Sequence, residues 1–427
     1  MGYSSLKGFI EETGFLDYRS KILKREYEAA LLLKKTQGKD KPVLFRVEDT
    51  EVDAVGNVVD TRERLRMALG VENDEEAYVK LMESLNPNRS KIIGFEDDRY
   101  REFEEGLLSL PAIKFYERDG GLYFTSSIVA ACVNGLCNAS IHRIMVVGEK
   151  EARIRIVPRH LWKLYSERKA RSEPLPVTIV MGVHPAYMIA SATSPPLGVF
   201  ELDIGSHILG GEELMESPIN KTPIPRGASI IIEARLMPEM ADEGPFTDIL
   251  LLYDKVRKQP VLKIDKIYVS REWPLAHVIL SGGLEHLQLM GFPREAQIWQ
   301  AVSKVVPKVK SIRLTPGGGG WLHAVISIAK NHPGDGKNAI LAAFAGHPSL
   351  KHVVVVDTDI DVIDSEMVEW AIATRFQADR DLVIIREVRG STLDPSGRDG
   401  YTAKMGIDAT IKGDNKEKYE RARIPGE

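Results

Sequence analysis

The sequence DEGPFTD at residues 242–248 carries two acids, Glu243 and Asp248, on either side of a Gly-Pro corner. Apolar segments flank it, ASIIIEARL at 228–236 and ILLLY at 249–253, and both patterns predict strands. Side chains five apart on a straight strand point to opposite faces, but a Gly-Pro kink can bring both acids to one cavity. Taken alone, the heptapeptide fits a solvated surface turn better than an active site; the rest of the chain reverses that preference.

Composition limits the classes of protein to consider. A chain of 427 residues predicts two or three domains. Its net charge of -4 gives no electrostatic case for a nucleic-acid or membrane-surface partner, and no apolar run reaches the length of a transmembrane helix. The only cysteines, Cys132 and Cys137, form neither a disulfide framework nor a CxxC motif, so we expect a reducing, cytoplasmic setting.

The order of apolar patterns predicts an α/β (α+β) multidomain protein. We expect an N-terminal α/β unit over 1–108, a split β-barrel of the flavin-reductase kind over 109–294, and a C-terminal α/β domain over 295–427. Predicted helices cover most of 1–40, and then 61–70, 74–85, 160–169, 296–306, 321–330 and 365–374. Predicted strands include 42–47, 121–125, 143–147, 153–157, 176–181, 311–314, 352–357 and 381–385, the last two as neighbours.

Two stretches of the C-terminal region resemble ligand loops only superficially. The glycines at 317–320 lack the Lys-Ser/Thr of a phosphate loop, which favours a structural turn. The acids at 357–361 lack the Gly and the closing Glu of a calcium loop, so we interpret them as a polar strand end.

The motif NASIHR at 138–143, together with EGPFTD at 243–248, resembles the UbiD family of reversible decarboxylases, which use prenylated FMN. The resemblance extends over about residues 40–410, and the motifs are specific as a set. The further motifs are VGNV at 55–58, GVHPA at 182–186, VVDTDID at 355–361, WAIATR at 370–375, LDPS at 393–396 and KMGIDAT at 404–410.

The resemblance implies a prenylated FMN held in the barrel, its phosphate bound through Mn²⁺ (or Mg²⁺) and K⁺. The metal ligands carried over are Asn138, His160 and Glu201, with Glu216 as an alternative to Glu201. Oxygen and imidazole donors suit such a metal. The other cofactor-binding residues implied are Ser140, Ile141, His142, Arg143, Arg159 and Lys404; the match to the family is weakest at His142 and Arg159.

The resemblance also implies a catalytic group of one arginine and two acids. Arg143 would pair with Glu243 and orient the substrate carboxylate, because a guanidinium binds carboxylates in a bidentate way. Asp248, in a more apolar setting that raises its pKa, would protonate the carbon that loses CO₂. Many members of the family carry Glu at this second position, so the shorter Asp248 alters the reach of the proton donor.

The implied activity is non-oxidative decarboxylation of an α,β-unsaturated carboxylic acid. The chain is most similar to short archaeal members, so the leading substrate is trans-anhydromevalonate 5-phosphate, decarboxylated to isopentenyl phosphate. A hydroxybenzoate-type acid of a ubiquinone-like pathway is the alternative, and an FMN reductase is a further one. The implied partners are the acid substrate, a flavin prenyltransferase that supplies the cofactor, and further copies of the chain in a homodimer or homohexamer.

Overall fold

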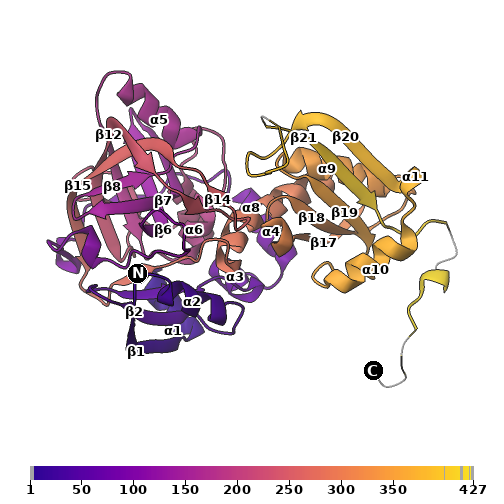
Figure 1. The fold of residues 1–427 in the computed structure, drawn as a ribbon, viewed down its shortest axis with the longest axis horizontal. Coiled ribbons are helices and arrows are strands. Elements are labelled where there is room, and N and C mark those ends of the chain that lie inside the picture. The colour runs from indigo at the N-terminus through magenta and orange to yellow at the C-terminus, as the bar shows by residue number, and fades with distance from the viewer. Residues whose placement is uncertain (1–3, 399, 414–416, 423, 425–427) are drawn as a thin grey trace. The chain divides into compact units, whose positions relative to one another are not determined.

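The computed structural model describes residues 4–398, 400–413, 417–422 and 424. The chain forms two compact units, one of Met1–Glu72 and Glu83–Leu289, the other of Asn73–Met82 and Met290–Glu427 (Figure 1). The division into domains at 108 and 294 stays a prediction.

A closed antiparallel barrel dominates the first unit. Its strands follow the order β12-β9-β6-β7-β8-β15, and β12 also pairs with β15, which closes the sheet; β5 extends it beside β15. The predicted barrel is therefore present. The strands are β5 (Tyr100–Glu102), β6 (Leu122–Val133), β7 (Leu136–Gly148), β8 (Glu151–Ile154), β9 (Leu175–Met181), β12 (Ile230–Glu243) and β15 (Arg257–Ser270).

The barrel closes around an apolar core because its strands alternate. Val129 and Ala131 on β6, Ile144 and Val146 on β7, and Ile230 on β12 are all buried in one cluster. Helix α5 (His160–Lys169) packs on this core through Leu161 and Leu164 and has the predicted bounds. The other elements of this region are the helices α6 (Pro185–Ser191) and α7 (Glu201–Ile208) and the short strands β10 (Leu214–Glu216), β11 (Pro223–Pro225), β13 (Phe246–Thr247), β14 (Tyr253–Asp254) and β16 (Leu275–His277).

The hairpin between β6 and β7 corrects one expectation. Cys132 lies directly opposite Cys137 in the ladder, and the two form a disulfide. The two-residue turn at Asn134 and Gly135 has positive φ at both positions, the geometry that closes such hairpins. The sequence spacing alone did not reveal this pairing because it depends on the strand register.

The N-terminal part of the first unit is less helical than predicted. A strand, β1 (Leu16–Leu23), interrupts the expected helical segment and pairs in parallel with β2, in a sheet of order β1-β2-β3-β16. The helix predicted over 61–70 is α3, and both its ends are capped: Thr61 accepts a hydrogen bond from the Arg64 N–H, and Gly70 ends the helix in the left-handed conformation. The remaining elements are α1 (Leu6–Thr13), α2 (Glu28–Thr36), β2 (Val43–Val47), β3 (Asp53–Gly56), α3 (Arg62–Leu69), β4 (Ile92–Ile93), η1 (Asp97–Arg99) and η2 (Leu107–Ser109).

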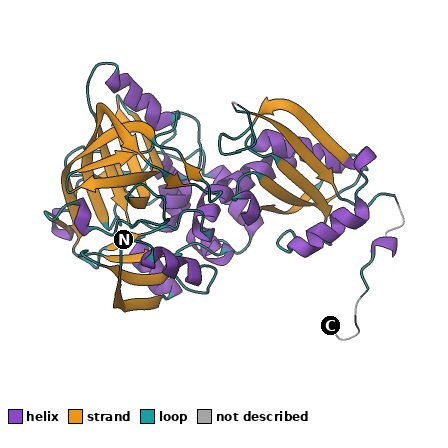
Figure 2. Ribbon diagram, in the orientation of Figure 1, coloured by secondary structure: helices purple, strands orange, loops and turns teal. Residues whose placement is uncertain are grey.

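The second unit is a five-stranded mixed sheet of order β17-β18-β19-β21-β20. Val353 and Val355 of β19 pack with α8 and α9, whereas Val354 and Val356 pack with α10, so helices cover both faces (Figure 2). The elements are α4 (Asp74–Glu83), α8 (Leu284–Val302, which begins in the first unit), β17 (Lys308–Leu314), η3 (Pro316–Gly318), β18 (His323–Ala329), α9 (Asp335–Gly346), β19 (His352–Asp357), α10 (Ser365–Arg375), α11 (Ala378–Asp381), β20 (Leu382–Arg389), β21 (Tyr401–Asp408) and η4 (Glu417–Tyr419).

Two predictions for this unit are wrong. The segment 321–330 contains strand β18 (His323–Ala329) rather than a helix, because its β-branched residues form the central ladder between β17 and β19. Strand β20 pairs with β21, not with β19. The glycines at 317–320 form the predicted turn, and Arg375 forms ion pairs with Asp357 and Asp359 at the predicted polar strand end.

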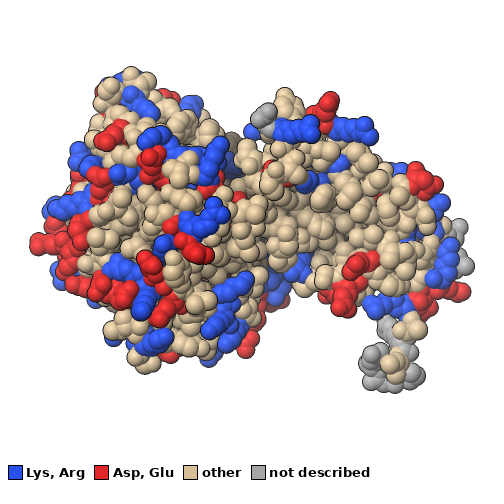
Figure 3. Space-filling view, viewed as in Figure 1, with Lys and Arg blue, Asp and Glu red and all other residues tan. Residues whose placement is uncertain are grey.

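Within the described residues, no helix is long and apolar enough to cross a membrane. On the face drawn in Figure 3, acidic and basic side chains are interspersed over the first unit. This mixed surface agrees with the net charge of -4.

Candidate active site

Arg143 and Glu243 form a bidentate ion pair in the first unit. The Nε and Nη2 atoms of Arg143, on β7, donate to the two carboxylate oxygens of Glu243, at the end of β12, over 2.8 and 2.9 Å. The Glu243 side chain is fully buried and that of Arg143 is 14% exposed. Burial lowers the pKa of Arg143, but Glu243 outweighs it and raises that pKa overall. The ion pair therefore fixes the position of the Arg143 guanidinium, which can orient a carboxylate.

Aromatic rings surround this ion pair. The guanidinium carbon of Arg143 lies 4.8 Å from the centre of the Phe246 ring, and Phe246 packs on Tyr123 with ring centres 4.4 Å apart. The Tyr123 hydroxyl donates to the Pro245 carbonyl, and burial, helped by the Glu243 charge, raises its pKa. These apolar neighbours lower the local dielectric and strengthen the charge interactions at Arg143.

The Gly-Pro corner turns the chain as the sequence indicates, but the segment after it is not the predicted strand. Residues 249–252 form a turn, and only Tyr253 and Asp254 pair, with Thr247 and Phe246. The cause is the Asp248 carboxylate, whose Oδ1 accepts the N–H groups of Leu250 and Leu252 over 2.8 and 3.0 Å.

Asp248 has the raised pKa expected of a proton donor. Burial raises the pKa, and the hydrogen bonds from the Leu252 and Leu250 N–H groups only partly oppose it. No hydrogen bond joins Asp248 to Arg143 among the described residues; the charge of Asp254 raises the pKa of Asp248 and that of Arg143 lowers it. Glu243 pairs directly with the Arg143 guanidinium, whereas Asp248 accepts hydrogen bonds from the backbone of its own turn, so the two acids have different environments.

Sequence reasoning missed three charged residues of this site. Asp254 accepts a 3.2 Å hydrogen bond from Arg143 Nη2 and is also bound by Arg257. Burial raises the pKa of Asp254, but Arg257 and Arg143 outweigh it, so that pKa is lowered. Arg155 adds a third cation, with its Nε 3.9 Å from Asp254. The strand register would have revealed Arg155, which faces Arg143, and Arg257, which faces Glu243.

Asn138 and Glu201 form a second polar pair. The Asn138 amide donates to Glu201 Oε1 over 2.8 Å, and the Ala139 N–H donates to Oε2 over 2.7 Å. Glu201 begins helix α7 and is 3% exposed. Burial raises its pKa to about 7, although these hydrogen bonds oppose the shift. A buried carboxylate whose described partners include no cation is a suitable oxygen ligand for a divalent metal.

A chain of hydrogen bonds runs from the Ser140 hydroxyl through His142 to the Arg155 carbonyl. The Ser140 hydroxyl lies 2.9 Å from His142 Nε2, and His142 Nδ1 lies 2.8 Å from the Arg155 carbonyl. Burial lowers the pKa of His142 to about 4, so the ring is neutral at pH 7. Because the carbonyl can only accept, Nδ1 carries the proton and Nε2 accepts from Ser140. Ser140 then has no proton for Asn138 Oδ1, 3.2 Å away, which leaves that oxygen available to a ligand.

The structure does not join the other predicted ligands to this pair. His160 opens helix α5, half-buried, and no described contact links it to Asn138 or Glu201. No group of three His, Cys, Asp or Glu that could hold a metal is found in the described part of the chain. Glu216 lies on β10 opposite Pro223, so Glu201 is the acid that contacts Asn138. The ligand set Asn138, His160 and Glu201 therefore stays a prediction, supported at two of its three positions.

The remaining predicted cofactor residues have other contacts. Arg159 is exposed and donates to the Ser194 hydroxyl over 3.1 Å. Ile141 pairs with Ile128 in the barrel wall. Lys404 belongs to the second unit, where its Nζ donates to the Pro348 carbonyl over 2.6 Å, and burial lowers its pKa to about 8. Their roles toward a flavin stay predictions.

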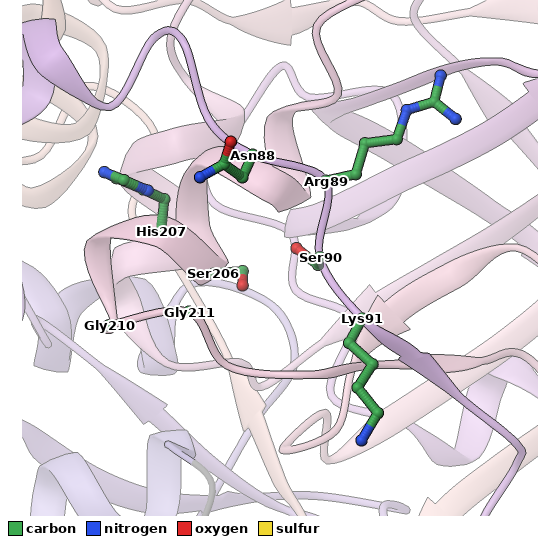
Figure 4. A pocket seen from close by; sticks show the side chains of 8 residues that line it. All are labelled: Asn88, Arg89, Ser90, Lys91, Ser206, His207, Gly210 and Gly211. Atoms are coloured by element: carbon green, nitrogen blue, oxygen red, sulfur yellow. The ribbon is translucent and has the colours of Figure 1, made fainter.

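A pocket of about 410 Å³ lies at the C-terminal end of α7. Figure 4 shows Arg89 and Lys91 pointing away from each other, and Lys91 is paired with Glu213. None of the predicted site residues lines it. The lining residues are Asn88, Arg89, Ser90, Lys91, Ser206, His207, Gly210 and Gly211.

Three domain profiles of one family match the chain. They are described as the N-terminal, Rift-related and C-terminal domains of 3-octaprenyl-4-hydroxybenzoate carboxy-lyase, and they match residues 9–85, 96–284 and 287–409. The chain belongs to the UbiD family. The matched ranges contain every residue of the Arg143–Glu243 and Asn138–Glu201 pairs, and the UbiD family is one of carboxy-lyases.

Among UbiD-family proteins, the anhydromevalonate phosphate decarboxylase of Aeropyrum pernix is 53% identical over 425 residues, covering 99% of this chain and 96% of that protein. The UbiD-class enzyme HmfF from Pelotomaculum thermopropionicum, solved with FMN, has a TM-score of 0.93 at 38% identity, covering 99% and 98% of the two chains. An evolved dimeric form of HmfF, solved with prenylated FMN, has a TM-score of 0.89 at 36% identity, covering 99% and 97%. The fold is thus one that holds a flavin in these relatives.

Proposed function

We propose that the protein decarboxylates trans-anhydromevalonate 5-phosphate to isopentenyl phosphate with prenylated FMN. The observation that carries the proposal is the bidentate Arg143–Glu243 pair, with Asp248 five residues after Glu243, in a chain with full-length similarity to the Aeropyrum pernix decarboxylase. That similarity favours the phosphorylated unsaturated acid over a hydroxybenzoate.

The chain's own residues divide the work. Arg143, fixed by Glu243 and Asp254, orients the substrate carboxylate for departure as CO₂. Asp248, whose pKa is raised by burial, delivers a proton to the carbon that has lost CO₂. Phe246 and Tyr123 restrict water around the ion pair. When bound, the prenylated flavin supplies the electron sink for the carbanion equivalent.

Asn138 and Glu201 fit the metal that would hold the flavin phosphate. Both offer buried oxygens, and Asn138 Oδ1 is left without a proton donor by the His142 tautomer. Mn²⁺ or Mg²⁺ accepts such donors. We assign His160 as third ligand, Lys404 as a flavin-phosphate contact and K⁺ as a second ion within this proposal.

The wider setting also belongs to the proposal. A flavin prenyltransferase would supply the cofactor, the chain would act in the cytoplasm, and it would assemble as a homodimer or homohexamer. Intracellular disulfides occur in hyperthermophilic archaea, so the Cys132–Cys137 bond is compatible with that location.

The direct test is activity after cofactor loading. The protein would be expressed with and without a flavin prenyltransferase, and the bound flavin identified by absorbance and mass. Only the co-expressed protein should release CO₂ from a panel of unsaturated acids, with the phosphorylated acid as the best substrate. Equal activity with unmodified FMN would overturn the proposal.

Removal of the Glu201 carboxylate should weaken metal binding. We expect Glu201→Gln to lower Mn²⁺ affinity by roughly tenfold or more, measured by calorimetry on flavin-free protein. Glu216→Gln is the matched control and should bind like the parent. Because a ligand carboxylate must be deprotonated and burial raises the pKa of Glu201 to about 7, parental affinity should rise as pH increases through about 7. An unchanged affinity in Glu201→Gln would remove Glu201 from the ligand set.

A further inference from the structure

Two arginines lie side by side in the barrel wall. Ile144 of β7 pairs with Ile154 of β8, and the Arg155 N–H donates to the Arg143 carbonyl over 3.3 Å. This antiparallel register places Arg143 and Arg155 opposite each other, with side chains on the same face. Like charges directly opposite on neighbouring strands are destabilising, so the arrangement requires an anion.

The anions within the described residues do not satisfy all the cations. Glu243 is fully engaged by Arg143 at 2.8 and 2.9 Å. Asp254 is shared by Arg143, Arg257 and Arg155. Three guanidinium groups therefore face two close carboxylates.

Arg155 is the cation with the weakest pairing. Its Nε is 3.9 Å from Asp254, too far for a hydrogen bond. Within the described part of the chain, its one side-chain hydrogen bond runs from Nη1 to the Ile156 carbonyl, over 3.2 Å. The side chain is 22% exposed, so solvent and ligands can reach it. Burial, followed by the charge of Arg257, lowers the pKa of Arg155, as expected of a cation without enough counter-charge.

The anion that Arg155 could bind is separate from the one expected at Asn138 and Glu201. Asn138 precedes Arg143 by five residues on β7, about 17 Å along an extended strand. A phosphate held through a metal at Asn138 would thus lie toward the other end of the strand. The Arg155 guanidinium instead lies on the same face as Arg143, the residue that is expected to bind the substrate carboxylate.

We propose that Arg155, supported by Arg257, is a specificity-determining residue that binds the phosphate of the substrate while Arg143 orients its carboxylate. The planar guanidinium offers two parallel donors to phosphate oxygens. This inference rests on the proposed function, because it names the residue that recognises the phosphate of that substrate.

The test uses the protein loaded with prenylated FMN. Turnover of trans-anhydromevalonate 5-phosphate is compared with that of the same acid without phosphate, in the parent, Arg155→Gln and Arg155→Lys. We expect Arg155→Gln to reduce the ratio of the two kcat/KM values by on the order of tenfold or more, mainly through a higher KM for the phosphorylated acid. Arg155→Lys should reduce the ratio less than Arg155→Gln does, because lysine keeps the positive charge but lacks the two parallel donors of the guanidinium.

Controls separate this inference from its alternatives. Inorganic phosphate should inhibit the parent competitively and Arg155→Gln more weakly. Arg153, two residues before Arg155, is paired with Glu151, and Arg153→Gln should behave as the parent. Loss of bound flavin in both Arg155 variants would show that the residue binds the cofactor, which would overturn the inference. An equal loss of kcat/KM on both acids would also overturn it. A parent protein that does not turn over the phosphorylated acid would overturn the proposed function. The inference is judged separately by phosphate inhibition, and equal inhibition of the parent and Arg155→Gln would reject it.

Discussion

Glu243→Gln should reduce kcat/KM by about 100- to 10,000-fold in the protein loaded with prenylated FMN. The substitution removes the charge that holds Arg143 over 2.8 and 2.9 Å and leaves the guanidinium with Asp254 as its remaining close carboxylate. Because the pair is buried, the free energy of unfolding should also fall, by up to about 3 kcal/mol. Steady-state kinetics and thermal unfolding followed by circular dichroism measure the two effects.

Asp242→Asn is the matched control for Glu243→Gln. Asp242 is the preceding residue of β12, its side chain is 63% exposed, and it pairs with Lys258 on the surface at 3.0 Å. Its loss should change stability by less than about 1 kcal/mol and leave turnover unchanged. If Glu243→Gln and Asp242→Asn had equal activity, the bidentate pair would have no part in catalysis.

Asp248→Asn should lower kcat by about 100- to 10,000-fold while the local turn stays intact. Asn keeps an Oδ1 that can accept the N–H groups of Leu250 and Leu252, so the substitution removes the titrating proton without removing the turn. Asp248→Glu should retain part of the activity, because it keeps the acid but lengthens its reach by one methylene. Single-turnover measurements at saturating substrate distinguish these variants.

The pH profile gives an independent test of Asp248. The donor must be protonated, and burial raises the pKa of Asp248 above its ordinary value. Turnover should therefore be highest below that pKa and decline as pH rises through it, and Asp248→Asn should lack this decline. Full turnover in Asp248→Asn would show that another group delivers the proton.

Local sequence signals predicted much of the first unit. Thr61 and Gly70 mark the ends of α3 because capping depends on neighbours within one turn. The start of α5 at His160 and the corner at Gly244 are likewise encoded locally. The Arg143–Glu243 pair is not local: its residues are 100 apart, and only the resemblance to the UbiD family brought them together.

The errors arose where pairing partners decide the structure. The segment WLHAVISIAK at 321–330 has apolar residues that fit either a helix or a strand, and the ladders on both sides of it make it a strand. The place of Arg155 beside Arg143 and the Cys132–Cys137 disulfide were missed for the same reason, since both follow from the register of β7 with β8 and β6. A one-residue change of register would have reversed these faces, so sequence spacing could not give them.

The most direct test of the account is proton delivery during decarboxylation. The loaded protein would convert trans-anhydromevalonate 5-phosphate in D₂O, and NMR would locate deuterium in the product. The account predicts isopentenyl phosphate with one deuterium on the carbon that lost CO₂, formed by the parent and severely slowed in Asp248→Asn. Recovery of unchanged acid from fully loaded parent protein, or equal rates in the parent and the variant, would contradict it.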